Sequence, residues 1–287
     1  MVDTKIQILI DKAGSLASLP DIFFKVNELV NDARSSASDI GRAIEQDAAL
    51  SARLLKIVNS PYYNFPSSID TISRAITIIG TRDLRDLVLA TTVTRTFSGM
   101  DNDLIDMEKY WRHNLYCAVA GRILAQQRHV KNTERLFVAG LLHDIGSLVM
   151  YQTIPELSNE ALQRTQSDGT PLYIAEKEII GFSHGDVGAA LLQKWKLPDS
   201  LIETVKYHHE PELAENHRED VATIHIADYI ANSIDEDSNR CGVITPLDER
   251  TWATTGLSLE VLDTALCEIT DKFLEMHSLL FPTTRAA

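Results

Sequence analysis

The chain has 287 residues, of which 44% are hydrophobic and 24% are charged, with 13 glycines and 9 prolines. These values exclude collagen-like, low-complexity and wholly disordered chains. The net charge is −14, and residues 1–100 contain equal numbers of basic and acidic side chains, so the whole acidic excess lies beyond them. Such a surface repels nucleic acid and anionic membranes. We therefore expect no DNA partner and no membrane partner.

Helical spacing of hydrophobic residues dominates the first hundred residues. It predicts about five short helices. The first opens at Ser18-Leu19-Pro20, the second follows a cap at Ser38, and the third begins at Ala48. The fourth follows a cap at Ser68, and the fifth begins at Thr81. A polar, turn-rich stretch follows at residues 98–106, where the charge balance also changes. We place a boundary there, between an N-terminal helical subdomain at residues 1–100 and a second helical subdomain at residues 101–287.

The second part of the chain continues the same pattern. Helices are expected at residues 108–127, 133–144, 155–167, 171–180, 184–195, 200–208, 220–234 and 258–281, the last of them a C-terminal helix. The sequence contains no alternating pattern typical of a strand and no internal repeat. It therefore predicts an all-α fold.

The sequence shows neither a secretory leader nor the roughly 18 uninterrupted apolar residues that indicate a membrane-spanning helix. Its three cysteines, Cys117, Cys241 and Cys267, lie far apart, without the C-x-x-C spacing of a redox or zinc motif. A reducing compartment suits this pattern best. We expect a cytoplasmic protein.

Histidines and aspartates stand out because they lie on, or at the ends of, helices that should be buried. Imidazole nitrogens and carboxylate oxygens are ligands that suit divalent transition metals. Burying several of them together without a metal costs free energy, because their polar atoms then need other partners. The residues concerned are His113, His143, Asp144, His184, His208, His209 and Asp228.

The pair His143-Asp144 ends a strongly apolar run at residues 136–142. Neighbouring side chains on a helix project about 100° apart, so this pair can serve two adjacent ion positions or bridge them. A bridging carboxylate is typical of two-metal hydrolytic sites, where the ions lie about 3.5–4 Å apart. Gly146 follows and allows a sharp exit or a close backbone approach.

Each of these residues also has an ordinary explanation. His113 alone could be a half-buried histidine, and His208 and His209 could be cations favoured by a helix C-terminus. Ser183 and Asp186 around His184 form a plausible capping box. Only the ordered set indicates a site. The other histidines are expected to pack beside it (His225) or to lie on the surface (His129, His217 and His277).

The order His, His-Asp, His, His-His, Asp resembles that of the HD superfamily of metal-dependent phosphohydrolases. Several upstream segments are similar to hallmark segments of the HDOD (HD-related output) domain, and the resemblance covers roughly residues 15–235. Those segments are Ser18-Leu19-Pro20, Gln46 to Ser51, Leu54 to Ser60, Ala75 to Gly80 and Leu84 to Leu89.

The resemblance implies a metal centre. In the HD pattern, His113, His143, Asp144 and Asp228 would form a primary site. His184, His208 and His209, with Asp144 shared, would hold a second ion, and the pattern does not choose between His208 and His209. One or two ions of Fe, Mn, Zn, Ni or Co are compatible with these ligands. HDOD domains are bacterial signalling modules, and many have lost the ligands and the activity.

The sequence departs from active HD enzymes at two points. Ser147 stands where many of them place a phosphate-binding lysine, and the Gly-Tyr-Pro motif of HD-type cyclic-di-GMP phosphodiesterases is absent after Pro211. Hydrolysis of cyclic-di-GMP by that route is therefore not expected. Arg82 and Arg85 could meet a phosphate, although an ordinary helix surface explains them equally well.

The ordered ligands and these departures leave three functional hypotheses. The first is a signalling or regulatory module with a His/Asp metal site and signalling proteins as partners. The alternative is an active metal-dependent phosphohydrolase acting on a nucleotide or another phosphate ester, with Asp144 as the catalytic ligand to both ions. A metal-free scaffold is the third.

The loop from Asn59 to Pro66 contains two tyrosines, a phenylalanine and two prolines. Exposed aromatic rings favour protein interfaces, so the loop could be a docking surface. It could equally be a lid whose rings pack on the helices that it joins.

Overall fold

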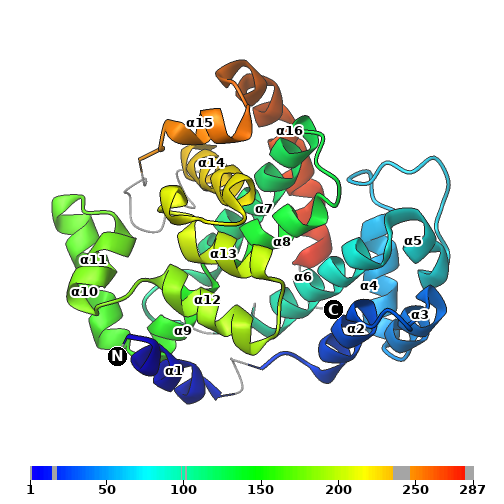
Figure 1. The fold of residues 1–287 in the computed structure, drawn as a ribbon, viewed down its shortest axis with the longest axis horizontal. Coiled ribbons are helices and arrows are strands. Elements are labelled where there is room, and N and C mark those ends of the chain that lie inside the picture. The colour runs from blue at the N-terminus through cyan, green and yellow to red at the C-terminus, as the bar shows by residue number, and fades with distance from the viewer. Residues whose placement is uncertain (1, 15–17, 98, 101, 235–245, 282–287) are drawn as a thin grey trace, which may run out of the picture.

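The computed structural model describes residues 2–14, 18–97, 99–100, 102–234 and 246–281. Throughout these residues the regular elements are helices, which confirms the predicted all-α fold (Figure 1). The first group is α1 (Val2–Lys12), α2 (Asp21–Asn31), α3 (Ala37–Glu45), α4 (Ala48–Val58), α5 (Ile72–Ile79) and α6 (Thr81–Phe97). None of the described helices is both long enough and apolar enough to cross a membrane.

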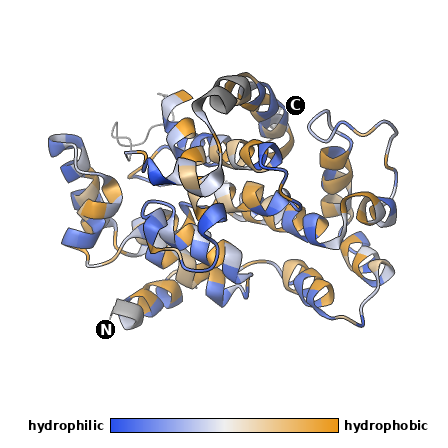
Figure 2. Ribbon diagram, turned by 45° about the horizontal axis from the view of Figure 1, so that its top comes forward, coloured by the Kyte–Doolittle hydropathy of each residue, from blue (hydrophilic) through white to orange (hydrophobic). Residues whose placement is uncertain are grey.

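The remaining helices belong to the second part of the chain, which carries the candidate ligands. They are α7 (Met107–Gln127), α8 (Glu134–Leu142), α9 (Ile145–Thr153), α10 (Pro155–Asp168), α11 (Leu172–Ile179), α12 (His184–Lys194), α13 (Asp199–Tyr207), the 3-10 helix η2 (Pro211–Leu213), α14 (Arg218–Ile234), α15 (Arg250–Thr255) and α16 (Leu259–Leu280). Alternating hydrophobic and hydrophilic bands along these helices show their amphipathic character (Figure 2).

Two of the predicted helix caps are wrong by a few residues. Ser36, rather than Ser38, caps α3, because it forms a reciprocal capping box with Asp39 that satisfies two backbone donors. Thr71, rather than Ser68, caps α5, where its hydroxyl accepts from the backbone N–H of Arg74 at 3.2 Å.

The described part of the chain also contains three α-helices that the sequence did not predict, α1, α9 and α15, as well as the short 3-10 helix η2. Of these, α9 matters most for the site, because it begins directly after the helix expected at residues 133–144. His143 and Asp144 form the break between α8 and α9. The pair therefore lies between two helices rather than inside one.

The second part of the chain is organised around α7, which packs against α8, α14 and α16 (Figure 1). From Tyr110 to Ala125 only Arg112 of this helix is more than slightly exposed. Glycines allow the helices to approach closely. A Cβ atom on Gly140 of α8 would lie 2.7 Å from backbone atoms of Ala118 in α7. A Cβ on Gly146 of α9 would lie 2.0 Å from the carbonyl oxygen of His184 at the start of α12.

One continuous hydrophobic core runs from α1 to α16. Helix α1 packs on α9 and α12, away from α2 to α5, although it begins the chain (Figure 1). The division into residues 1–100 and residues 101–287 remains a prediction.

The aromatic loop between α4 and α5 packs inward. The interpretation of its tyrosines as part of a docking surface is therefore wrong. Tyr62 is buried, and its ring meets that of Phe137 edge-on at 6.0 Å between centroids. The guanidinium of Arg122 lies over Tyr62 and Tyr63, at 4.3 and 4.9 Å from the ring centroids. These cation–π contacts tie the loop to α7 and α8.

The close approach at Gly146 predicts a strong stability effect. Gly146→Ala should lower the free energy of unfolding by about 3 kcal/mol, the upper end of typical overpacking costs, because the new methyl group meets backbone rather than a movable side chain. Chemical denaturation measures the change. Gly99→Ala is the matched control, since nothing lies within 4 Å of its Cβ position. Equal stability of the two variants would contradict the close packing of α9 on α12.

Candidate metal centre

The structure brings all seven predicted site residues together. His113 comes from the middle of α7, and Asp228 comes from α14. His184 is the first residue of α12, where Ser183 and Asp186 form the capping box that the sequence also suggested. The remaining residues stand at helix ends: His143 and Asp144 between α8 and α9, and His208 and His209 after α13.

The ligand atoms form two groups. In the first group, the Nε2 atom of His113 lies 3.0 Å from Oδ1 of Asp228 and 3.2 Å from Nε2 of His143. In the second group, Nε2 of His184 lies 3.2 Å from Oδ1 of Asp144, 3.3 Å from Nε2 of His208 and 3.1 Å from Nε2 of His209. Both His208 and His209 thus face the second group.

Asp144 connects the two groups. Its Oδ1 atom faces His184 of the second group at 3.2 Å, whereas its Oδ2 atom faces His143 of the first group at 3.4 Å. The carboxylate therefore presents one oxygen to each cluster of histidines. This is the arrangement of a carboxylate that bridges two ions.

The spacing of these atoms fits metal coordination. Two donors that each lie about 2.1 Å from one ion, at 90–110° to each other, are separated by about 3.0–3.4 Å. Five of the nitrogen–nitrogen and nitrogen–oxygen distances within the groups lie between 3.0 and 3.3 Å, in this range. Nε2 of His143 lies 3.5 Å from Oδ1 of Asp228, and Nε2 of His208 lies 3.9 Å from Oδ1 of Asp144. Two imidazole lone pairs that face each other at such distances repel unless a proton or a cation lies between them. The donor set of each group therefore fits a metal ion.

Contacts behind the histidines fix which ring nitrogen faces the centre. Nδ1 of His143 lies 2.7 Å from the carbonyl oxygen of Gly140, and Nδ1 of His208 lies 2.7 Å from that of Val205. A carbonyl only accepts, so each Nδ1 carries the proton and donates it. The opposite nitrogen, Nε2, is then the one that faces the centre, and it presents a lone pair there once it carries no proton, as a metal ligand requires.

Glu176 of α11 is a site residue that the sequence did not reveal. It is buried, and one of its carboxylate oxygens accepts from the backbone N–H of His184 at 2.8 Å and lies 2.7 Å from Nδ1 of the same residue. Such carboxylate–histidine pairs orient a ligand and raise its basicity. In the sequence, Glu176 looks like part of a solvent-exposed helix face, because Lys177 and Glu178 stand beside it. The only signal for it was its position in a predicted helix.

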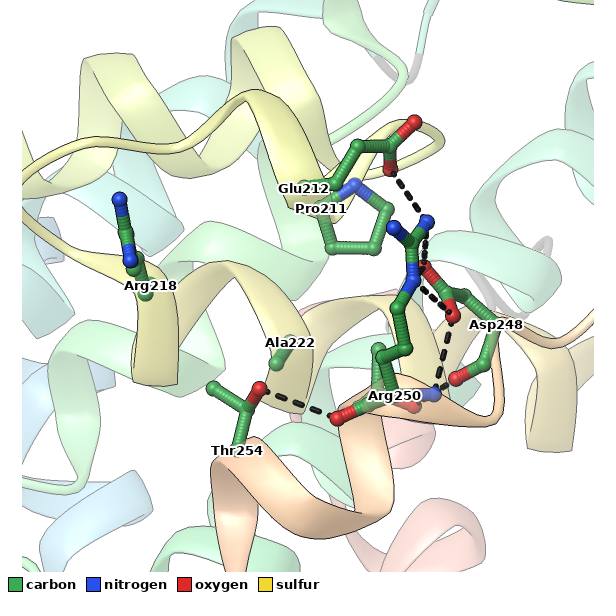
Figure 3. A pocket seen from close by; sticks show the side chains of 8 residues that line it. Pro211, Glu212, Arg218, Ala222, Asp248, Arg250 and Thr254 are labelled. Carbon is green, nitrogen blue, oxygen red and sulfur yellow. Dashed lines mark hydrogen bonds and ion pairs between the residues drawn. The ribbon is translucent and has the colours of Figure 1, made fainter.

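His225 packs behind the centre, as expected. Its Nδ1 donates to the carbonyl oxygen of His208 at 2.6 Å, and its Nε2 accepts from the backbone N–H of Asp248 at 3.0 Å. The carboxylate of Asp248 is held in turn by Arg250 (Figure 3). A chain of contacts therefore runs from the start of α15 to a ligand of the second group. His129, His217 and His277 belong to neither group.

Burial controls the charge of the ligands. It lowers the pKa of His208 and His209 well below the usual value, and neighbouring histidines add to this effect. Burial raises the pKa of Asp228, but hydrogen bonds from His113 and His143 outweigh it and hold that pKa well below its usual value. Burial likewise lowers the pKa of His143, yet interactions with Cys117 and Asp228 raise it to about 10.

The sequence profile of the HDOD domain matches residues 16–211, more than half of the chain. The chain belongs to the HDOD family. The match ends before Asp228, so the placement of that residue in the centre comes from the structure.

Several known proteins are similar to this HDOD chain. A proposed phosphohydrolase from Shewanella amazonensis SB2B is 25% identical, with a TM-score of 0.73 over 95% of this chain and 97% of that one. An HDOD domain protein of unknown function from Geobacter sulfurreducens is 22% identical, with a TM-score of 0.74 over 97% and 99%. A proposed signal transduction protein from Marinobacter aquaeolei VT8 is 19% identical, with a TM-score of 0.68 over 92% and 59%.

An uncharacterized protein of Treponema pallidum (strain Nichols) is 24% identical over 227 residues, which are 78% of this chain. The match covers 44% of the Treponema protein, so the HDOD chain spans less than half the length of this relative.

Glu176 provides a test of the outer contacts. Glu176→Gln keeps the shape of the side chain but removes its charge, and it should weaken metal binding by about tenfold, the lower end of the effect typical of such contacts. Competition between the protein and a chromogenic chelator for Zn²⁺ measures the change. Glu178→Gln, an exposed residue of the same helix, should leave the affinity unaltered. Equal losses in both variants would contradict the role of Glu176.

The protonation states predict how metal binding depends on pH. His208 and His209 stay neutral at pH 7 because their pKa values are lowered, whereas His143, with a pKa of about 10, must lose a proton when it ligates. Zn²⁺ affinity should therefore rise by up to tenfold for each pH unit between about pH 7 and 9. Calorimetry in buffers of different ionisation enthalpy counts the proton released, and a count of zero would contradict this assignment.

Proposed function

We propose that this HDOD chain is a regulatory module whose His/Asp cluster holds two divalent transition-metal ions and takes a ligand that carries a phosphate group. The observation that carries the proposal is the position of Asp144, which offers one oxygen to each of two groups of ligands. A cluster built for a single ion has no need of a second complete set of histidines.

The charge of the centre favours an anionic ligand. Asp144 and Asp228 are the two carboxylates among the seven ligands, and the five histidines bind as neutral groups. Two divalent ions therefore keep an excess of positive charge after the protein has supplied its ligands. A phosphate group, with several oxygen donors and up to two negative charges, neutralises that excess and can span both ions.

The closure of the centre favours a regulatory role. Side chains of the ligands are 1–4% exposed, apart from that of His209 at 14%. Such low exposure restricts the access of a large substrate to the cluster, which favours the binding of a small anion over turnover. The fold is similar to that of a protein named for signal transduction, which agrees with such a role. This similarity concerns the fold alone.

Hydrolysis of a phosphate ester is the second candidate function, and the shared carboxylate also favours it. When bound, two ions supply charge neutralisation and an activated water. This chain would contribute Asp144 to hold both ions, with Glu176 to orient His184. His209, which is 14% exposed and stacks on the Tyr173 ring at 4.9 Å between centroids, is the ligand nearest to solvent, so a substrate would approach from its side.

Metal content tests the proposed centre. Plasma mass spectrometry should find about two transition-metal ions per chain, and Asp144→Ala should retain at most one, because each ion loses a ligand. Circular dichroism checks that the variant is folded. Full metal content in Asp144→Ala, or no metal in the wild-type chain after reconstitution, would contradict the proposal.

Turnover separates the two functions. Chromogenic phosphate mono- and diesters are incubated with the metal-loaded chain, and the regulatory function predicts binding without hydrolysis. Hydrolysis that disappears in Asp144→Ala would establish the second candidate instead. Hydrolysis that persists in that variant would arise outside the centre, because Asp144 is the ligand shared by both groups.

A further inference from the structure

A polar pocket lies between the N-terminal helices and the helices that carry the candidate metal ligands. Its volume is about 260 Å³. Three arginines and one carboxylate line it, together with amide and hydroxyl groups: Arg82, Arg85, Arg135, Asp86, Asn31, Asn132 and Ser200.

The three arginines differ in how far they are already neutralised. Arg135 is fully used, since it binds both carboxylate oxygens of Asp220 and the carbonyl oxygens of residues 131 and 132. Arg85 is about nine-tenths buried and binds Asp86 through Nε and Nη2, which leaves its Nη1 without a hydrogen bond to any described residue. Arg82 forms neither a hydrogen bond nor an ion pair within the described ranges.

The pocket therefore keeps one positive charge, that of Arg82, without a carboxylate partner in the described part of the chain. The buried guanidinium of Arg85 can still donate hydrogen bonds through Nη1. The start of α13 adds to this polarity. Its N-cap is Pro198, which offers no capping side chain, and Ser200 of its first turn lines the pocket, although Asp199 in the same turn already offsets part of the positive charge of the helix N-terminus. Guanidinium groups and helix N-termini both bind phosphate oxygens well.

We propose that this arginine pocket binds a small anion that carries a phosphate group, and that the anion joins the N-terminal helices to α8 and α13. Drug-sized ligands occupy about 300–1,000 Å³, so a pocket of about 260 Å³ suits inorganic phosphate or a small phosphate monoester. Arg82 and Arg85 come from α6, Asn132 lies two residues before the start of α8, and Ser200 is the second residue of α13.

The position of the pocket connects it to the metal centre. Helix α8 begins at the pocket and ends at His143, and α13 begins at the pocket and ends at His208. Each has nine residues, a length of about 14 Å. The two helices also pack against each other. An anion that holds their first turns together therefore acts on two elements that deliver ligands at their last turns.

The pocket drawn in Figure 3 has a different character. Two arginines and two carboxylates line it, so its charges balance (Figure 3). Arg250 is bound by Asp248 and lies 3.6 Å from Glu212, whereas Arg218 donates to the carbonyl oxygen of Ala214. The arginine pocket, by contrast, is lined by three arginines and one carboxylate.

Calorimetric titration of the full chain with inorganic phosphate tests the proposal. Phosphate can also bind at the metal centre, so the titration is made on the wild-type chain and on Asp144→Ala. We expect Asp144→Ala to retain one phosphate site. Adding Arg82→Ala should weaken that site by tenfold or more, since a hydrogen bond to a charged group contributes at least about 1.4 kcal/mol, which is a factor of ten.

Arg74→Ala is the matched control, because Arg74 is an exposed arginine of α5 that does not line the arginine pocket. It should leave phosphate binding unchanged. In the wild-type chain, Arg82→Ala should remove one bound phosphate and leave the metal content intact. Phosphate binding that disappears entirely in folded Asp144→Ala, or that is the same with and without Arg82, would overturn the proposal while leaving the metal centre untouched.

The connection through α8 and α13 has its own readout. Phosphate should slow the release of metal to a chelator several-fold in the wild-type chain and less in Arg82→Ala. Direct binding of phosphate to the metals is the same in both proteins, so the difference between them reports the pocket. Identical effects of phosphate on the two proteins would overturn the connection.

Discussion

The organisation of the metal centre depends on one carboxylate held at a break between two helices. Asp144 lies outside both α8 and α9, and this freedom lets its two oxygens face opposite groups of histidines. Inside a continuous helix its side chain would be confined to one face. The close contact of Gly146 with the start of α12 fixes the direction in which the chain leaves the break and brings His184 within reach. Fold and site are therefore specified by the same few residues.

The second layer of contacts fixes the orientation of the histidines in the cluster. Two of them donate Nδ1–H to backbone carbonyls three residues earlier, and a third faces the buried carboxylate of Glu176. Because substitution of a side chain leaves the backbone carbonyl in place, the helices themselves fix the orientation of His143 and His208. His184 begins its helix and has no preceding turn to supply such a carbonyl. A side chain from α11 takes its place.

Much of the fold and the ligand set could be predicted from the sequence, because both leave local signals. Amphipathic spacing indicated most helices, and the order of the histidines and aspartates indicated their gathering. Glu176 could not be predicted, since only the packing of α11 on α12 buries a carboxylate that looks solvated in sequence. The break at Asp144 was hidden by an apolar run that continues into α9. Helix α1 did leave a signal, because Ile6, Leu9, Ile10 and Ala13 are buried at helical spacing.

The uneven exposure of the candidate ligands bears on how the proposed ions would exchange. His209 of the second group is 14% exposed, whereas the other six side chains are at most 4% exposed. If the cluster holds the two ions proposed above, the ion of the second group has the shorter route to solvent, and the ion of the first group would exchange through it. The centre would then have an exchangeable half and a slowly exchanging half.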